Sequence, residues 1–329
     1  MRGAAGCVLA ALLVAAPTAS AADRYAVVVT GASGGESYTL QYDTWRNGFV
    51  ATLHNKFGFD AGHLAVLGET EGAGVLPATR PQVQKTLADL ARRLTRDDFL
   101  FVLLIGHGTS ANGEEAKFNL VGPDLSASEW ADLLRPIPAR LAFVNTTGAS
   151  FPFMAKVAGR GRLVLTATDS AMQQFDTVFP EFFVKGFDDP SADADKNGRA
   201  SILEVFNYAS VKVKQWFEER GRLPTERPVL DDDGDGIGRE AQNPGRDGTI
   251  ATAMYLDAGA PGATVSGATV PGATVPVGGA NEALLRTRAD LEAKIEALKG
   301  ARTGMAAEAF NAELERLLTE LARVSQQLR

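Results

Sequence analysis

The feature that most constrains the fold is a series of short, almost continuously apolar runs separated by amphipathic stretches. The apolar runs are residues 25–30, 63–67, 98–106, 140–145 and 162–168. The stretches between them that have the apolar spacing of helices are residues 43–57, 81–94 and 126–134. A strand that lacks polar residues is buried on both faces, and helices between consecutive strands provide that cover. The sequence therefore predicts an α/β fold with a mostly parallel sheet sandwiched by helices.

The start of the third helix carries a local signal of its own. Ser126 and Glu129 have the Ser-x-x-Glu spacing of a capping box, just before Trp130. We therefore expect this helix to begin directly after Ser126.

Composition divides the chain into five parts. We expect a signal peptide at 1–22, an α/β domain at 23–188, an acidic and glycine-rich extension at 189–257, a Gly/Ala/Thr/Val/Pro linker at 258–280 and a helical region at 281–329. The first part has a basic residue, the apolar stretch "CVLAALLVAA" and the small-residue site "TASA", which are the three parts of a secretory signal. We expect cleavage near Ala21 or Ala22 and hence an exported protein, periplasmic or extracellular.

Composition also excludes several classes of function. The only cysteine, Cys7, lies inside the signal segment, so the mature chain has no thiol for disulfides, thiolate metal sites or cysteine catalysis. The formal net charge is -7 and there is no basic stripe, which argues against nucleic acid as a partner. No later segment approaches the roughly 18 apolar residues that a membrane span needs, so we expect none.

Chemistry in parallel α/β sheets gathers at the carboxyl ends of the strands. His107 follows the apolar run "FVLLIG" and precedes a glycine, so its imidazole is expected on a tight turn at this edge, where it can act as a base. Thr146, Thr147 and Ser150 follow the next apolar run, "RLAFVN". We expect these hydroxyl groups within reach of the His107 turn.

A His-Gly pair after one buried strand and a turn of small polar residues after the next resembles the arrangement of the caspase-like cysteine peptidases. Within that clan the chain looks most like the legumain and glycosylphosphatidylinositol transamidase branch. The matching stretches are "RYAVVVTGASG", "DDFLFVLLIGHGTS", "RLAFVNTTGAS" and "RLVLTATDS", and the similarity covers roughly Arg24 to Asp188. The resemblance implies a caspase-like fold in which His107 takes the catalytic histidine position and Thr147 stands where the family has its cysteine.

The replaced cysteine favours a catalytically degenerate site. A thiol is partly ionised near neutral pH, whereas a threonine hydroxyl needs a strong, positioned base. Thr147 is also internal and β-branched, and Ser150 lies further downstream, where it needs a different turn geometry. No acidic residue in the matching stretches stands out as an orienting partner for His107. We therefore expect a peptidase homologue that acts as a binding or scaffold module, with a peptide as candidate ligand.

One alternative stays open: an active endopeptidase or transpeptidase-like enzyme that uses His107 with Thr147 or Ser150. Whether the chain is an enzyme is therefore undecided at this point. The two hypotheses differ in whether either hydroxyl group has a base beside it.

The extension carries the most specific motif of the chain, the stretch "DADKNGRASILE". Its oxygen donors have the spacing of an EF-hand calcium loop, namely Asp193, Asp195 and Asn197 at positions 1, 3 and 5, the Arg199 carbonyl at 7, Ser201 at 9 and Glu204 at 12. Gly198 occupies the position of the sharp turn, and helical stretches flank the loop. We predict that Ca²⁺ binds here; a solvated acidic loop is the alternative.

A second acidic cluster, "LDDDGDGIGRE", repeats the opening of such a loop with Asp231, Asp233, Asp235 and Gly236. Its twelfth position is Gln242, and no clear second helix follows. The cluster is either a partial calcium site paired with the first or a solvated turn.

Residues 281–329 have the apolar spacing of a coiled coil. The apolar positions are Leu284, Leu291, Ile295 and Leu298, then Phe310, Leu314, Leu317, Leu321, Val324 and Leu328. Gly300 and Gly304 interrupt the pattern, so we expect an antiparallel helical hairpin. Two helices leave apolar surface uncovered, so the hairpin recruits an unknown protein partner, self-associates or docks on the chain's own domain.

Overall fold

The computed structural model describes residues 22–70, 72–111, 113, 115–257, 291, 294, 298 and 307–327. The expected signal segment up to residue 21 and the expected linker 258–280 lie outside the described residues. The chain divides into two compact units, Met1–Val265 and Ser266–Arg329, and each is described by itself.

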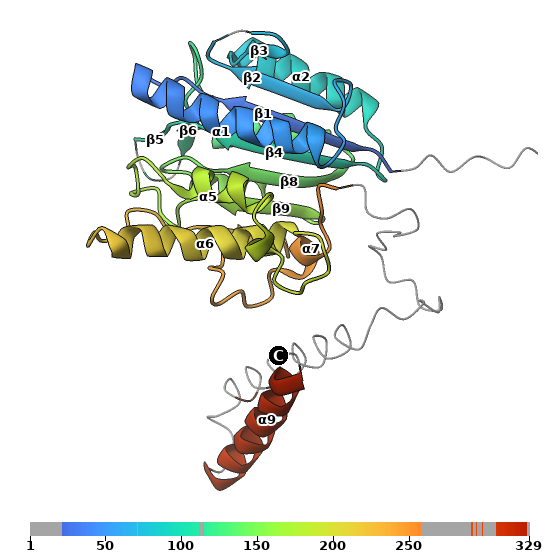
Figure 1. The fold of residues 1–329 in the computed structure, drawn as a ribbon, viewed down its shortest axis with the longest axis vertical. Helices are drawn as coiled ribbons and strands as arrows, with labels where there is room; N and C mark the ends of the chain where they lie inside the picture. The colour runs from blue at the N-terminus through green and yellow to red at the C-terminus, as the bar shows by residue number, and fades with distance from the viewer. Residues whose placement is uncertain are drawn as a thin grey trace, which may run out of the picture. The chain divides into compact units, whose positions relative to one another are not determined.

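A seven-stranded sheet forms the centre of the first unit (Figure 1). Its strands are β1 (Arg24–Thr30), β2 (Leu64–Gly68), β3 (Val75–Pro77), β4 (Phe99–Ile105), β8 (Arg140–Asn145), β9 (Arg162–Thr166) and β10 (Val229–Asp231). They follow the order β10-β9-β8-β4-β1-β2-β3. The neighbours are parallel except for β10, which runs antiparallel to β9. The prediction of an α/β fold with a mostly parallel sheet is confirmed.

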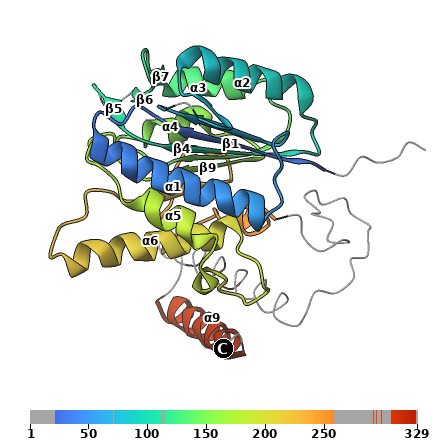
Figure 2. The same ribbon diagram turned by 45° about the horizontal axis from the view of Figure 1, so that its top comes forward.

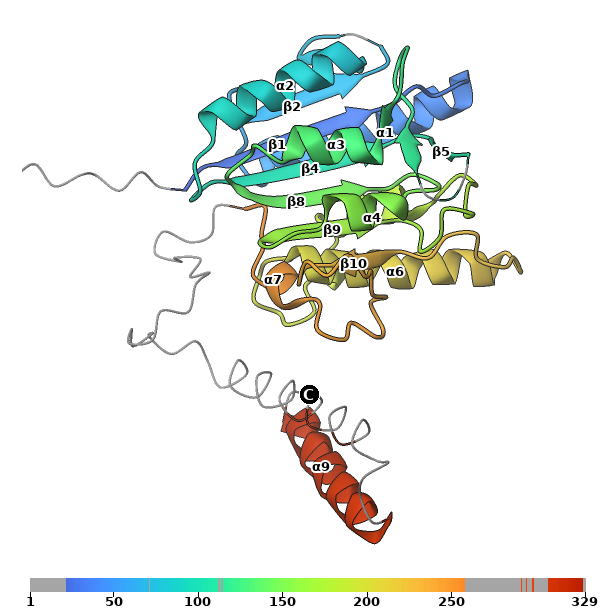
Figure 3. The ribbon, with the colours of Figure 1, turned by 180° about the vertical axis from the view of Figure 1, so that it is seen from behind.

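Helices cover both faces of this sheet, as Figures 1 and 3 show from opposite sides and Figure 2 shows in a tilted view. One face carries α1 (Glu36–Asn55), α5 (Phe179–Gly186), α6 (Ile202–Glu219) and α7 (Thr249–Thr252). The other face carries α2 (Arg80–Arg93), α3 (Ala127–Leu134) and α4 (Pro152–Val157). All seven residues of β4 are buried, with Phe101 and Leu103 in the first core and Val102 in the second. This double burial explains why the strand contains no polar residue.

A smaller antiparallel sheet lies between β4 and α3 in the chain, which the sequence pattern did not predict. Its strands are β5 (Gly108–Ser110), β6 (Ala116–Phe118) and β7 (Leu125–Ser126). The last of them leads into α3 through the expected capping box: the Ser126 hydroxyl accepts from the Glu129 amide, and the Ser126 amide donates to the Glu129 carboxylate at 2.9 Å. The prediction that this helix begins after Ser126 is confirmed.

The second unit contains the helix α9 (Ala307–Gln327). Leu317 of this helix is buried together with Leu291 and Leu298, and the partly buried Phe310, Leu314 and Val324 pack against this cluster. The interrupting glycines Gly300 and Gly304, the apolar positions Leu284, Ile295 and Leu328 and the side chain of Leu321 lie outside the described residues. The predicted hairpin therefore stays a prediction. In the part of the chain that the structure describes, no helix is both long enough and apolar enough to cross a membrane.

One buried carboxylate holds the start of α5. Glu226 is 2% exposed, and its two oxygens accept from the amides of Val178 at 2.7 Å and Phe179 at 3.1 Å. Burial raises the pKa of Glu226 to about 7, and the two amide hydrogen bonds oppose that shift. The folded chain therefore binds a proton at Glu226 at a pH where the unfolded chain has already lost it.

The buried Glu226 makes the free energy of unfolding depend on pH in a direction that can be predicted. Because the folded pKa of Glu226 is raised, ionisation destabilises the folded chain, and the free energy of unfolding falls as pH rises from 5 to 8. The contribution is on the order of 3 kcal/mol at most. Denaturant titration of the wild type and of Glu226→Gln between pH 5 and 8 measures this contribution. The free energy of unfolding of the variant should fall less with rising pH than that of the wild type. Glu181→Gln, at a partly exposed position of α5, is the control, and parallel curves for Glu226→Gln and wild type would contradict the assignment.

Candidate functional site

The carboxyl ends of β4 and β8 bring the predicted residues together at one edge of the sheet. His107 lies just beyond β4, and the turn Thr146–Ser150 lies just beyond β8. The two turns touch, because a Cβ atom placed on Gly108 would lie 2.5 Å from the Thr147 hydroxyl. We call His107, Tyr38, Tyr42, Asp176 and the turn Thr146–Ser150 the strand-end site.

The His107 ring is held on both of its nitrogens. Nε2 lies 2.9 Å from the carbonyl oxygen of Ser33, and Nδ1 lies 3.1 Å from a carboxylate oxygen of Asp176. A carbonyl oxygen only accepts, so Nε2 carries the hydrogen of this bond. Both nitrogens are thus directed at acceptors.

Two tyrosines of α1 surround the same ring. Tyr38 meets the His107 ring edge-on at a centroid distance of 4.7 Å, and the Tyr42 hydroxyl lies 3.2 to 3.3 Å from the two ring nitrogens. Tyr38 also donates to Asp176, and this hydrogen bond raises the pKa of Tyr38. Burial raises the pKa of Tyr42, so its hydroxyl stays protonated.

Asp176 is the residue of this site that sequence reasoning missed. It lies in the loop between β9 and α5, beyond the stretches that resemble the peptidase clan. The loop has no periodic pattern, so no signal in the sequence pairs it with His107. Its carboxylate is the orienting partner that the sequence did not reveal.

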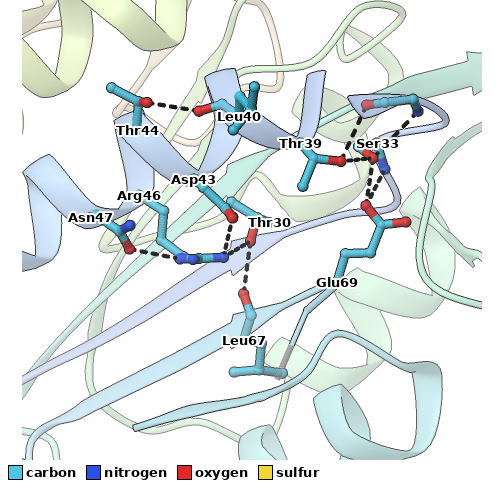
Figure 4. A network of polar contacts seen from close by, with 11 residues as sticks. Thr30, Ser33, Thr39, Leu40, Asp43, Thr44, Arg46, Asn47, Leu67 and Glu69 are labelled. Carbon is cyan, nitrogen blue, oxygen red and sulfur yellow. Dashed lines mark hydrogen bonds and ion pairs between the residues drawn. The ribbon is translucent and has the colours of Figure 1, made fainter. Parts of the chain in front are cut away.

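The loop after β1 supplies the acceptor for His107 and is pinned by polar contacts (Figure 4). The Ser33 amide donates to Glu69 at 3.1 Å, and the Ser33 hydroxyl contacts both Glu69 and Thr39. Ser33 is 3% exposed. Because Ser33 is fixed from both sides, the orientation of the His107 ring is set by the backbone of the neighbouring strand end.

The Thr147 hydroxyl is hydrogen-bonded within its own turn. It donates to the side-chain oxygen of Asn145 at 2.8 Å and lies 3.0 Å from the Gly148 carbonyl oxygen. The Thr147 amide donates to the same Asn145 oxygen at 3.1 Å, and Thr147 is completely buried. The residue in the cysteine position of the resemblance is therefore part of a local hydrogen-bonded turn.

The Ser150 and Thr146 hydroxyls are also engaged elsewhere. Ser150 Oγ lies 3.0 Å from the Thr168 hydroxyl and accepts from the Thr168 amide, and Thr146 donates to the Leu104 carbonyl oxygen at 2.7 Å. All three hydroxyl-bearing residues of the turn are fully buried. Among the described residues, no hydrogen bond joins His107 to Thr147 or Ser150. The site thus has an oriented histidine without a hydroxyl group of the turn beside it.

The first acidic loop lies between the short 3-10 helix η1 (Pro190–Ala192) and α6. Carboxylate oxygens of Asp193, Asp195 and Glu204 all lie within 4.8 Å of one another. Asn197 donates to Asp195 at 2.8 Å, so its side chain is at the same place. Burial is the main cause that raises the pKa of Asp195, and the charge of Glu204 adds to it. The structure brings these four side chains together.

The other predicted ligands of this loop have further roles. The Ser201 hydroxyl accepts from the Glu204 amide, and the Ser201 amide donates to the Glu204 carboxylate at 2.8 Å, which makes a capping box for α6. The Arg199 side chain points to Asp257 with two contacts of 2.6 and 2.7 Å and stacks on Tyr255 at 3.8 Å. Arg199 can therefore contribute its backbone carbonyl oxygen, as the prediction specified.

The second acidic loop follows β10. Carboxylate oxygens of Asp231, Asp233 and Asp235 lie within 4.8 Å of one another, and Asp231 is 1% exposed. Burial is the main cause that raises the pKa of Asp231, and the neighbouring charges of Asp235 and Asp233 add to it. Gly236 has a φ of 76°, a conformation that favours glycine at this turn.

A further carboxylate in this region, Asp247, was not predicted. Asp247 accepts from the amides of Asp232 at 2.9 Å and Asp233 at 3.2 Å. Burial, together with the charges of Asp231 and Asp232, raises the pKa of Asp247 to about 6. Asp247 lies beyond Gln242, the twelfth position of the motif, so the expected spacing could not identify it.

The contact between the two turns of the strand-end site can be tested by a small substitution. A Cβ atom at Gly108 would lie 2.2 Å from the Gly148 carbonyl oxygen, so Gly108→Ala should lower the free energy of unfolding by about 3 kcal/mol. Gly48→Ala is the control: this exposed helical position has no atom within 4 Å, and the change should stabilise by about 0.5–1 kcal/mol. Thermal or chemical unfolding of both variants measures the difference. A neutral Gly108→Ala would contradict the described packing.

Comparison with known proteins leaves the chain without an assigned family. No protein-family model matches it, and no curated protein matches it. Among solved structures it is similar to a structural-genomics target protein from Geobacter sulfurreducens, with 12% identity and a TM-score of 0.40 over 66% of this chain and 97% of that one. A likeness of this degree assigns neither a family nor an activity.

Proposed function

We propose that the chain is an exported, catalytically degenerate module of the caspase and legumain type that presents its strand-end site as a binding surface. The observation that carries this proposal is the state of the Thr147 hydroxyl, which is buried and bonded to Asn145. A nucleophile must be within hydrogen-bond reach of its base and open to a substrate. Thr147 meets neither condition in the described arrangement.

The histidine adds to this argument. A general base needs an unprotonated nitrogen directed at the nucleophile. In His107, Nε2 donates to the Ser33 carbonyl oxygen and Nδ1 faces Asp176. Neither nitrogen is directed at Thr147 or Ser150, so deprotonation of either hydroxyl would require the ring and the turn to rearrange together.

The alternative is a working endopeptidase or a transpeptidase-like enzyme. What supports it is the Asp176–His107 pair, since a carboxylate on one ring nitrogen is the usual way to orient a catalytic imidazole. The partly exposed side chain of His107 would then have to activate Thr147 or Ser150 after a local rearrangement.

Incubation of the purified full chain with mixed peptide libraries and with an acylating activity probe separates the two functions. We expect no turnover above the buffer rate and no labelled residue, because neither Thr147 nor Ser150 has a base beside it. His107→Ala, Thr147→Ala and Ser150→Ala are the matched variants, each checked for unchanged folding by circular dichroism. Turnover in the wild type that is lost in His107→Ala and in either hydroxyl variant would establish the enzyme and exclude a degenerate site.

We also propose that the first acidic loop binds Ca²⁺ and that the cation stabilises the extension. Oxygen ligands at this spacing, with a carboxylate at the twelfth position, suit a hard cation of this size. The mutual approach of Asp193, Asp195 and Glu204 supports the proposal, because a cation among them would offset their repulsion. The second cluster, Asp231 with Asp233 and Asp235, is proposed as a weaker, partial site.

Differential scanning calorimetry with and without Ca²⁺ tests this proposal. Saturating Ca²⁺ should raise the melting temperature and a chelator should lower it, since a ligand at 100 times its Kd stabilises by about 2.7 kcal/mol. Glu204→Gln should remove most of this Ca²⁺-dependent shift. The same variant also weakens the capping box of α6, so the shift and not the baseline melting temperature is the relevant measurement.

Glu218→Gln is the matched control on the same helix, because Glu218 is exposed and pairs only loosely with Lys214 at 3.8 Å. It should leave the Ca²⁺-dependent shift unchanged. Asp231→Asn separates the second cluster from the first. An identical melting temperature with Ca²⁺ and with chelator in the wild type would exclude a stabilising cation.

The C-terminal region is proposed to bring a protein partner or a second copy to this module. Its apolar spacing supports this role, as does Leu318 of α9, which is 48% exposed. Export is proposed on the N-terminal sequence pattern alone.

A further inference from the structure

The segment Ser170–Thr177, which we call the strap, lies directly on the turn Thr146–Ser150. The Ala149 amide donates to the Gln173 carbonyl oxygen at 2.7 Å. A Cβ atom at Gly148 would lie 2.6 Å from the Phe175 carbonyl oxygen, so the strap backbone passes immediately over this glycine. The strap therefore covers the backbone of this turn at Gly148 and Ala149.

Polar contacts hold the strap at three further places. Gln174 donates to the Ser110 carbonyl oxygen at 2.9 Å, and Thr177 donates to the Thr146 carbonyl oxygen at 2.5 Å. Between them, Asp176 pairs with His107 at 3.1 Å and accepts from Tyr38. The pair Asp176–His107 joins the strap to the turn that follows β4.

The large apolar side chains of the strap make no comparable anchor. Met172 is 75% exposed and Phe175 is 67% exposed, and the buried residues of the strap are the small Ala171 and Thr177. Each hydrogen bond that breaks when the strap opens is exchanged for one with water, at a net cost of only about 1 kcal/mol. The sheet beneath, in contrast, is fixed by fully buried apolar residues. The strap therefore belongs to the part of the molecule with a low free energy of local opening.

The closed strap also holds a strained residue. Ala149 has a φ of 52°, a conformation that costs a residue with a Cβ on the order of 1 kcal/mol. The hydrogen bond from the Ala149 amide to Gln173 fixes this conformation. Opening of the strap would release the strain, and this release offsets part of the cost of breaking the hydrogen bonds.

We propose that the strap is a lid that opens while the sheet stays folded, and that the contact of Asp176 with His107 is its latch. In the closed state the lid covers the turn Thr146–Ser150; in the open state it uncovers this turn to a ligand. The proposal concerns access to the strand-end site, and it goes beyond the function proposed above because it holds for a binding module and for an enzyme alike.

Native-state hydrogen exchange on the full chain tests the lid. The Ala149 amide is bonded to the strap, whereas the Thr146 amide, in the same turn, is bonded to the Leu104 carbonyl oxygen of β4. We expect Ala149 to exchange at least about tenfold faster than Thr146 under native conditions. Asp176→Ala should accelerate exchange at Ala149 further and leave Thr146 unchanged. Glu181→Ala, on α5 outside the strap, should change neither amide.

Thiol labelling gives a second readout that does not depend on amide assignment. In a Cys7→Ser background, Thr147→Cys reports opening of the strap, and Ala142→Cys, at a fully buried position of β8, reports global unfolding. We expect Thr147→Cys to react faster, and faster still with Asp176→Ala. Equal labelling rates at both positions, or equal exchange at Ala149 and Thr146 with and without Asp176→Ala, would overturn the lid.

Discussion

Burial of β4 on both faces is the constraint on which the rest of the structure depends. All seven of its side chains, Phe99 to Ile105, are enclosed by helices of the two layers, so no polar side chain can lie along the strand. Polar groups can begin only where the strand ends, and His107 lies at that point. The same logic holds for β8 and the turn that contains Thr147. The position of the strand-end site thus follows from the double cover of the sheet.

The strand-end site and the acidic loops differ in the hydrogen-bond partners of their polar groups. In the strand-end site the hydroxyls of Thr147 and Ser150, the Asp176 carboxylate and both ring nitrogens of His107 have protein partners of suitable kind. In the acidic loops, carboxylates lie close to other carboxylates and mostly receive backbone amides. Like charges that lie close together repel one another, whereas hydroxyl groups with hydrogen-bond partners do not. The strand-end site is therefore stable as it stands. The acidic loops would gain stability from a cation.

The parts that could be predicted from the sequence are those set by local pattern. Apolar runs identified the parallel strands, and the spacing of Ser126 and Glu129 identified a helix start, because both depend on neighbours in the chain. The spacing of Asp193, Asp195 and Glu204 placed three carboxylates together for the same reason. Asp176 and Asp247 could not be found, since each meets its partners through the fold. The direction of the Thr147 hydroxyl was equally inaccessible, because it is decided by Asn145 and the packing around it.

The salt bridge between Arg199 and Asp257 links two segments of the chain and would carry a mechanical load between them. Asp257 precedes the stretch 258–280, and Arg199 belongs to the first acidic loop. Tyr255 connects the same two segments by its stacking on Arg199 and its contact with Asn197. A pulling force applied through the C-terminal region would therefore load this salt bridge and the acidic loop together with the start of β1, because the Arg24 side chain donates to the Leu256 carbonyl oxygen and Leu256 is buried in the first core.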